Sequence, residues 1–246
     1  MKKIIYSILG LYSMTSIVSA NIYIDQNLPT LDDCYAQAVP IESKLRGYLG
    51  MFFGGDYNQF KSVFSEDQFH LNTNSKVFGF RPGIYAGLGW NWHHLYLGLE
   101  LSTNYHWLNK KTDFSNNNMN HYVKISEYGS AVSDLIVGYL TKNRSWLYYL
   151  KFGLGSDWDH VSMKIYDTTG QQQYSKSKDY FNFKWEGGLG LEWICSDRFS
   201  IRYELLYTHN NGGKNWNDEY TSGHTFHYEL KRMQALMLNL GMSIGF

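Results

Sequence analysis

The sequence predicts an all-β fold, an eight-stranded antiparallel up-and-down transmembrane β-barrel. The last strand alternates apolar residues with small or polar ones up to a C-terminal aromatic. Its apolar positions are Leu236, Leu238, Leu240, Met242, Ile244 and Phe246, and Met237 is the one exception to the alternation. Segments with this period of two recur eight times along the chain. Aromatic residues make up 17% of the chain, with 21 Tyr and 8 Trp, which is typical of the girdles at membrane interfaces. These observations predict a protein of the bacterial outer membrane.

The N-terminus predicts export through a cleavable signal peptide, residues 1–20. A basic start with Lys2 and Lys3 precedes a mostly apolar run over 4–18, and Val18-Ser19-Ala20 supplies small residues at a cleavage site. An uncleaved membrane anchor is the alternative, but the run is shorter than the ~20 apolar residues that a spanning helix needs. We therefore expect a periplasmic N-terminal segment, 21–44, followed by the barrel, 45–246.

Composition narrows the class further. The chain has 23 Gly and 3 Pro, as expected where strands bend without losing hydrogen-bond donors of the ladder. Basic and acidic residues number 22 each, and loss of Lys2 and Lys3 leaves 22 − 2 = 20 basic residues, so no nucleic-acid partner is indicated. Because lipid tolerates no unpaired backbone, an exported membrane protein without an apolar helical span is a closed barrel.

Each expected strand reaches the ~9–11 residues that a tilted membrane strand requires. In chain order the strands are 45–60, 76–92, 95–108, 127–141, 145–166, 179–194, 198–210 and 227–246. The connections after the even-numbered strands are tight and centre on His93-His94, Lys142-Asn143-Arg144 and Ser196-Asp197. The others are longer and polar, as in Asn116-Asn117-Asn118. This alternation predicts short periplasmic turns and long extracellular loops.

Charged residues of both signs share one face of the predicted sheet with glycine. The other face is apolar, as at Leu97, Leu99 and Leu101. An Arg or Lys at mid-depth in lipid costs ~2–4 kcal/mol, so the charged face is expected to line the lumen. A soluble lipocalin-like barrel would have the opposite arrangement. The predicted lumen residues are Arg46, Asp56, Arg81, Glu100, Asp134, Lys151, Lys184, Glu186, Glu192, Arg198, Arg202 and Glu204.

An eight-stranded barrel has an interior just wide enough for side chains to fill. Isolated charges there would be costly, so the mixture of signs predicts a hydrogen-bonded plug of Arg and Lys against Glu and Asp. We expect no catalytic residue and no cofactor. Two alternatives stay open at this point, which are a catalytic role for Glu186 or Glu204 and a small passive channel. Because closure of the barrel removes every sheet edge, a monomer is expected.

Four short motifs combine glycine with aromatic or aliphatic residues: Gly47-Tyr48-Leu49-Gly50, Tyr85-Ala86-Gly87-Leu88-Gly89-Trp90, Trp185-Glu186-Gly187-Gly188-Leu189-Gly190 and Ser243-Ile244-Gly245-Phe246. With the leader, they resemble the opacity-type outer-membrane β-barrels, relatives of the transmembrane domain of outer-membrane protein A. The resemblance implies a surface antigen, adhesin or envelope-stabilising protein in lipid and lipopolysaccharide, with a host or matrix ligand at its loops. It also implies that Phe246 is read by the barrel-assembly machinery.

The two cysteines are expected at the same end of the barrel. Cys34 lies in the predicted periplasmic segment and Cys195 lies at the turn between the sixth and seventh strands. The ends of strands one and seven would lie within roughly 10 Å, a gap that the residues between Cys34 and strand one can span. An oxidising compartment favours pairing. A Cys34–Cys195 disulfide and two unpaired thiols are the two alternatives.

Histidines gather at the predicted extracellular end: His70, His106, His121, His160, His209, His224 and His227. Their spacing matches no metal-ligand motif, so we predict solvated loop residues and no metal. The rival function is a lipid A acyltransferase or deacylase, which needs a nucleophile and an acid–base set near the outer leaflet. Ser156, His160 and His209 are the candidates, but the fifth and seventh strands are not neighbours, so we expect no convergence.

Overall fold

The computed structural model describes residues 45–66, 69–116, 119–210, 214–219 and 225–246. The predicted signal peptide and periplasmic segment lie outside the described residues. Within the described part, no helix is long and apolar enough to cross a membrane.

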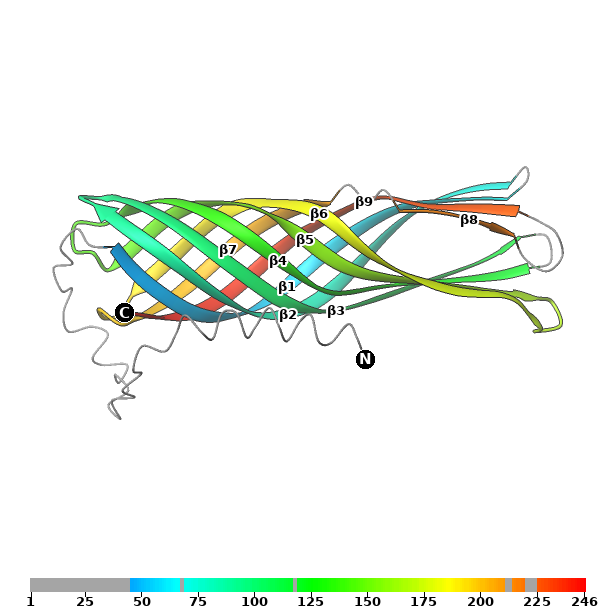
Figure 1. Cartoon of the computed structure of the whole chain (residues 1–246), viewed down its shortest axis with the longest axis horizontal. Helices are drawn as coiled ribbons and strands as arrows, with labels where there is room; N and C mark the ends of the chain where they lie inside the picture. Colours follow the sequence, from blue (N-terminus) through cyan, green and yellow to red (C-terminus); the bar gives the residue numbers. More distant parts are fainter. Residues whose placement is uncertain (1–44, 67–68, 117–118, 211–213, 220–224) are drawn as a thin grey trace, which may run out of the picture. The chain divides into compact units, whose positions relative to one another are not determined.

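Nine β-strands account for nearly all of this part (Figure 1). They are β1 (Leu45–Glu66), β2 (Phe69–Trp92), β3 (Leu95–Asn116), β4 (Met119–Leu140), β5 (Trp146–Asp167), β6 (Gln172–Ile194), β7 (Phe199–Asn210), β8 (Lys214–Glu219) and β9 (Thr225–Gly245).

The strands form one closed antiparallel ring. Each strand from β1 to β6 pairs with the next, β7 pairs with β9, and β9 returns to β1, where Tyr48 lies opposite Gly245. The short β8 pairs with the upper part of β9, from Thr225 to Leu230, and β7 with the lower part, from Met233 to Ile244. Together β7 and β8 occupy one position in the ring. The predicted eight-stranded up-and-down barrel is confirmed.

Three tight connections lie at one end of the ring, as the sequence predicts. His93 and His94 join β2 to β3, and His93 has φ 56°, as a two-residue hairpin of this kind requires. The segments 141–145 and 195–198 join β4 to β5 and β6 to β7. Short turns mark the periplasmic end of such barrels.

Apolar side chains cover the outside of the ring between two aromatic belts. Leu99, Leu135, Leu150 and Leu238 are among the exposed apolar residues of this zone. The inner girdle contains Trp90, Trp92, Tyr139, Tyr148, Trp193 and Phe246, and the outer girdle contains Tyr57, Phe78, Trp107, Tyr128, Trp158, Phe181 and Tyr207. In β5, Tyr148 and Trp158 are separated by the ~9–11 residues that a tilted strand needs to cross the bilayer.

The narrow lumen depends on rings that lie over glycines of the neighbouring strand. A Cβ atom on Gly190 would be 2.0 Å from Cζ of Tyr149, and one on Gly87 would be 2.4 Å from Cζ of Tyr48. Such contacts are forbidden to any other residue. Glycine therefore faces inward here because the tyrosine rings occupy the space that a side chain would need.

All strands but β7 continue well beyond the outer girdle, and the predicted long loops are largely strand instead. We call this part the extension and define it as 58–66, 69–77, 108–116, 119–127, 159–167, 172–180, 214–219 and 225–235. Its strands were missed where the sequence reads as polar loop, for example at 69–75 and 119–126. The loop expected between the last two strands contains β8.

In the extension the ring divides into two four-stranded sheets. The ladder between β2 and β3 ends at Phe80 and Trp107, and the ladder between β6 and β7 ends at Lys184 and Asn210. Above these points β8, β9, β1 and β2 form one sheet, and β3, β4, β5 and β6 form the other. Figure 1 shows the two groups as separate layers at the end of the structure opposite to the three tight turns.

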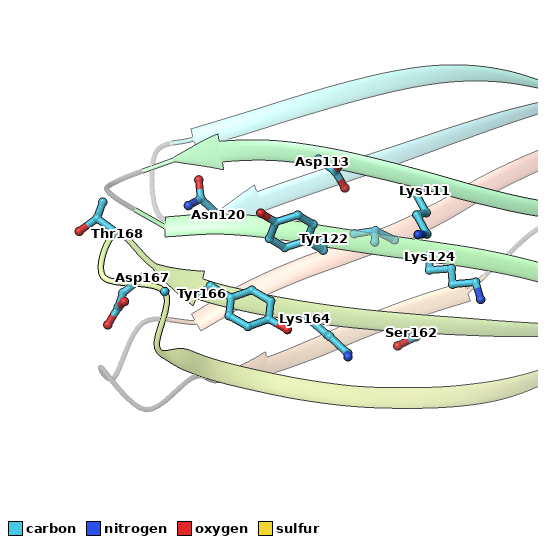
Figure 2. Close-up of a pocket in the computed structure, with 12 residues that line it drawn as sticks. Lys111, Asp113, Asn120, Tyr122, Lys124, Ser162, Lys164, Tyr166, Asp167 and Thr168 are labelled. Carbon is cyan, nitrogen blue, oxygen red and sulfur yellow. The ribbon is translucent and has the colours of Figure 1, made fainter.

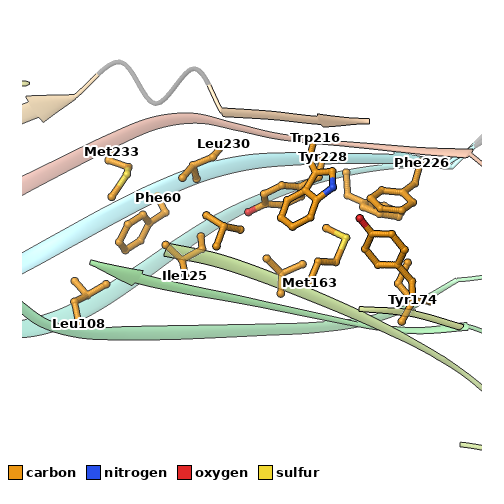
Figure 3. Packing of buried hydrophobic residues seen from close by; sticks show 14 residues of the cluster. Phe60, Leu108, Ile125, Met163, Tyr174, Trp216, Phe226, Tyr228, Leu230 and Met233 are labelled. Carbon is orange, nitrogen blue, oxygen red and sulfur yellow. The ribbon is translucent and has the colours of Figure 1, made fainter. Parts of the chain in front are cut away.

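A buried apolar cluster fills the space between the two sheets (Figure 3). It takes side chains from every strand that contributes to the extension except β2, whose Phe69, Leu71 and Val77 pack against it. Its members are Phe60, Phe64, Leu108, Val123, Ile125, Val161, Met163, Ile165, Tyr174, Trp216, Phe226, Tyr228, Leu230 and Met233. The extension is therefore a sandwich with a core of its own.

Candidate functional site

The lumen contains a network of buried charges centred on Lys151 of β5. Its Nζ lies 2.7 Å from Glu100 Oε1, 3.3 Å from Asp134 Oδ2 and 3.4 Å from Glu204 Oε1. All four side chains are at most 5% exposed. These four side chains come from β5, β3, β4 and β7. In each strand the residue alternates with lipid-facing neighbours and therefore points into the lumen.

Arg202 of β7 forms the second centre of the network. Its Nη1 lies 2.5 Å from Glu100 Oε2, and its Nη2 lies 3.1 Å from Glu192 Oε2. Three tyrosine rings surround the guanidinium: Cζ is 4.5 Å from the ring centroid of Tyr85, 5.4 Å from that of Tyr48 and 5.5 Å from that of Tyr149. Arginine in such a cage gains cation–π contacts in addition to its ion pairs.

A third group lies nearer the outer girdle, around Lys184 of β6. Lys184 Nζ is 3.1 Å from Asp157 Oδ1 and 3.6 Å from Glu186 Oε2, and it donates a hydrogen bond to Ser130 Oγ at 2.9 Å. Arg81 of β2 is buried at the same depth, and its Cζ lies 5.6 Å from the centroid of the Phe52 ring. Nine of the predicted residues thus lie in the lumen: Arg81, Glu100, Asp134, Lys151, Lys184, Glu186, Glu192, Arg202 and Glu204.

Two predicted lumen residues lie at the periplasmic mouth instead. Arg46 donates a hydrogen bond to the Asp197 carbonyl in an exposed position, and its guanidinium fills the space beside Gly245. Arg198 is exposed in the turn before β7, so its assignment to the lumen was wrong. The prediction for Arg198 is wrong because the turn between β6 and β7 ends one residue later than the period-two pattern indicates.

The histidine pattern misplaced two residues that are buried. His106 lies between Asp56 and Glu127, with Nε2 bonded to the Asp56 carboxylate and Nδ1 2.8 Å from Glu127 Oε1. His121 is fully buried in the extension. The parity of β3 would have placed His106 inward, since Leu99 and Leu101 face out. Sequence reasoning also missed Asp157, which shares the parity of Lys151.

The other predicted residues are placed as follows. Phe246 exchanges backbone hydrogen bonds with Gly47, at 2.9 and 3.2 Å, and its ring lies over that glycine. Its role in assembly stays a prediction. Cys195 is buried in the β6–β7 turn, whereas Cys34 lies outside the described residues, so the predicted disulfide stays a prediction.

The residues considered for lipid A chemistry occupy separate surroundings. His160 Nδ1 lies 2.7 Å from Asp179 Oδ1 across β5 and β6. His209 of β7 packs against Trp185, with ring centroids 5.7 Å apart. Ser156 and His160 lie on β5 and His209 lies on β7, and β6 separates these two strands.

A surface groove of about 610 Å³ lies on the outer face of the extension, over β3, β4, β5 and the β5–β6 turn (Figure 2). We call it the lysine–tyrosine groove. Its lining contains Lys111, Asp113, Asn120, Tyr122, Val123, Lys124, Ser162, Lys164, Tyr166, Asp167, Thr168 and Gly170. Tyr122 and Tyr166 meet edge to face, with ring centroids 5.4 Å apart and an interplanar angle of 83°.

The carboxylate of Asp167 is committed to the turn at one end of this groove. Its Oδ1 accepts hydrogen bonds from the backbone N of Thr169 at 2.9 Å, from Thr169 Oγ1 at 2.6 Å and from the backbone N of Gln171 at 2.8 Å. These bonds, that of the Thr169 hydroxyl first, lower the pKa of Asp167. Gly170 completes the turn with φ 83°, a conformation that favours glycine.

Comparison with known proteins agrees with the fold. The model of the "Outer membrane protein beta-barrel domain" family matches residues 34–232. No curated protein sequence matches the chain significantly.

Solved structures that it resembles include Ail, the attachment invasion locus protein of Yersinia pestis, at 12% identity over 84% of this chain and 100% of that one, with a TM-score of 0.35. Neisserial surface protein A matches at 13% identity, over 80% and 97%, with a TM-score of 0.32. A major outer membrane protein from Thermus thermophilus matches at 12%, over 78% and 99%, with a TM-score of 0.42.

Proposed function

Because this chain belongs to the outer-membrane protein β-barrel family and resides in the bacterial outer membrane, we propose that it is a non-enzymatic, adhesin-type surface protein that meets an external ligand through its extension. The observation that carries the proposal is the apolar core of the extension. Strands that end at the membrane surface suffice for an anchor. Here about nine further residues per strand are folded around fourteen buried apolar side chains on the side away from the periplasm.

A folded extension suits binding better than mobile loops do. Binding sites built on strands are held more rigidly, so less conformational entropy is lost when a ligand is bound. The outer faces of both sheets are polar and exposed, as at Lys61, Asn72 and Lys164. They offer two broad surfaces for an external partner.

Attachment of whole cells tests the proposal. Cells that display the intact protein should bind a host-cell or abiotic matrix more strongly than cells that display a variant with all four external hairpins shortened to the outer girdle. Liposomes that carry the intact protein should compete with the cells. The shortened variant must reach the outer membrane in equal amount and retain heat-modifiable mobility. Equal attachment of both strains would overturn the proposal.

The lipid A-modifying enzyme is the rival within the same membrane. The separation of Ser156, His160 and His209 on β5 and β7 favours the non-enzymatic alternative. Mass spectra of lipid A from cells with and without the protein should be identical. A change in acyl-chain composition that depends on the protein would support the enzyme instead.

A further inference from the structure

Three lysines of the lysine–tyrosine groove form a cationic cluster. Lys111 of β3 lies directly opposite Lys124 of β4, and Lys164 of β5 lies opposite Tyr122, one diagonal step from Lys124. All three are exposed, and in the described part of the chain no carboxylate forms an ion pair with any of them. Like charges directly opposite each other in a sheet are destabilising, so folding alone gives no reason for this pairing.

The lining of the groove has two acidic residues against three lysines. Asp167 is held by its four hydrogen bonds in the turn. Asp113 lies opposite Tyr122 and is the one remaining carboxylate of the lining. Figure 2 shows Lys124 and Ser162 at one end of the groove and Asp167 and Thr168 at the other, with the tyrosines between them.

The groove also offers apolar surface beside its charged groups. The rings of Tyr122 and Tyr166 and the methylene stems of the lysines supply apolar surface beside hydroxyl and ammonium donors. The face of an aromatic ring suits the C–H face of a sugar ring, and Tyr122 and Tyr166 present their rings at an angle of 83° to each other. The ammonium groups suit carboxylate or sulfate substituents on such a sugar ring. A bare inorganic anion would use the lysines and leave the tyrosines without a role.

The position of the groove indicates from which side a ligand arrives. Lys124 lies four residues beyond Tyr128 of the outer girdle, and Lys164 lies six residues beyond Trp158. At ~3.3 Å per residue the lysines are roughly 13–20 Å along the strands from the membrane interface. The groove continues from there to the β5–β6 turn, at the end of the structure away from the bilayer.

From this geometry we infer that the lysine–tyrosine groove binds an acidic polysaccharide presented from outside the cell, through ammonium contacts to its anionic groups and stacking of its rings on Tyr122 and Tyr166. The inference rests on the proposed surface-binding function and names its ligand class. One sheet of the extension carries this site. The outer face of the other sheet carries amides such as Asn72 and Asn74 as well as the exposed lysines Lys61 and Lys76.

Binding of fluorescent octasaccharides to the full-length protein in liposomes tests the inference. The probes are a uronic acid octasaccharide, its O-sulfated derivative and neutral maltooctaose. We expect the acidic probes to bind and maltooctaose to bind at least tenfold more weakly. The double variant Lys111→Gln/Lys124→Gln should lose at least fivefold in affinity for the acidic probes, with a shallower salt dependence. Tyr122→Ala should lose affinity even at high salt, where the ionic contribution is screened.

Lys61→Gln/Lys76→Gln is the matched control, because it removes two exposed lysines from the outer face of the other sheet. It should change affinity less than twofold. An equal loss in both double variants, failure of both acidic probes to bind, or binding only to lipopolysaccharide in the vesicle would overturn the inference. Cells that attach normally while the octasaccharides fail would overturn this inference alone. Attachment that is independent of the whole extension would overturn the proposed function.

Discussion

Lys151 pairs with three carboxylates of the lumen, of which Glu100 also pairs with Arg202. Glu100, Asp134 and Glu204 come from three different strands and approach the same ammonium group within 3.4 Å. Burying charges is expensive, and their mutual attraction offsets the cost only when every member is paired. The lysine therefore links β3, β4 and β7 through β5 at the centre of the barrel.

Replacement of this lysine tests the network. Lys151→Met retains most of the apolar stem but removes the ammonium group that Glu100, Asp134 and Glu204 share, and should lower the free energy of unfolding by about 3–5 kcal/mol. Urea titration in lipid, with folded and unfolded forms separated by their gel mobility, measures the loss. Leu150→Met is the control, since Leu150 faces lipid and the substitution conserves volume. Equal stability of Lys151→Met and the parent would show that the network does not stabilise the barrel.

The period-two pattern predicted which residues face the lumen, because the same alternation holds in the strands between the two girdles. Glu100, Lys151 and Arg202 alternate with leucine, phenylalanine and tyrosine on the lipid side, so their direction could be read from the sequence. Their ion-pair partners could not be read from the sequence. Which carboxylate meets which cation depends on the stagger of strands that are far apart in the chain, as for Arg202 and Glu100. The groove was missed because Lys111 and Lys124 lay in a segment taken for a loop, so they could not be paired with Lys164 of the predicted fifth strand.

At the scale of elements, the strands that cross the outer girdle exchange their apolar and polar faces there. In β1, Phe53 faces lipid below the girdle, whereas Phe60 and Phe64 face the core above it. In β5, Leu154 faces out and Met163 faces in. A search that recognises strands by their outward-facing apolar residues therefore loses them above the girdle. Irregularities of register at Tyr105/Leu108 and Glu127/Gly129 break the period of two further and hide the upper parts of β3 and β4.

The core of the extension also encloses the imidazole ring of His121. His121 lies between Phe64 and Phe114, with both ring centroids 4.8 Å from its own. Its Nε2 is 3.6 Å from the Glu66 carboxylate. Burial lowers the pKa of His121 to about 4. The folded extension therefore holds this histidine neutral at pH 7.

Acidification should loosen the extension. In the unfolded segment His121 would take up a proton near its ordinary pKa of about 6.5, whereas in the folded one it does so only near 4, so stability falls as the pH falls between these values. At pH 5 we expect a loss of roughly 1–2 kcal/mol relative to pH 7.5. Protease cleavage within 119–127 and 159–167 measures it.

His121→Phe is the control for this pH effect, because it retains the aromatic packing and removes the titration. The difference in cleavage between pH 7.5 and pH 5 should be much smaller in that variant than in the parent. A parent extension that is equally resistant at both values would contradict the assignment of the effect to His121.

At the scale of the whole molecule, two different plugs close the axis of the ring. The lumen between the girdles is filled by charged and tyrosine side chains, and the extension above it is filled by the apolar cluster of Phe60, Leu108, Met233 and their neighbours. Ions would have to pass both. Folded protein in planar bilayers should therefore show no discrete conductance steps, and reproducible steps would support the passive channel instead.

The extension is the feature on which the proposed binding function depends, and hydrogen–deuterium exchange of the full-length protein in lipid bilayers tests it most directly. The amides of 119–127 and 159–167 pair with each other in the β4–β5 ladder above the outer girdle. They should exchange slowly, within about tenfold of the amides of the same two strands between the girdles. Exchange at the rate of an unstructured chain in these segments would show that the molecule has mobile loops there and would contradict the account.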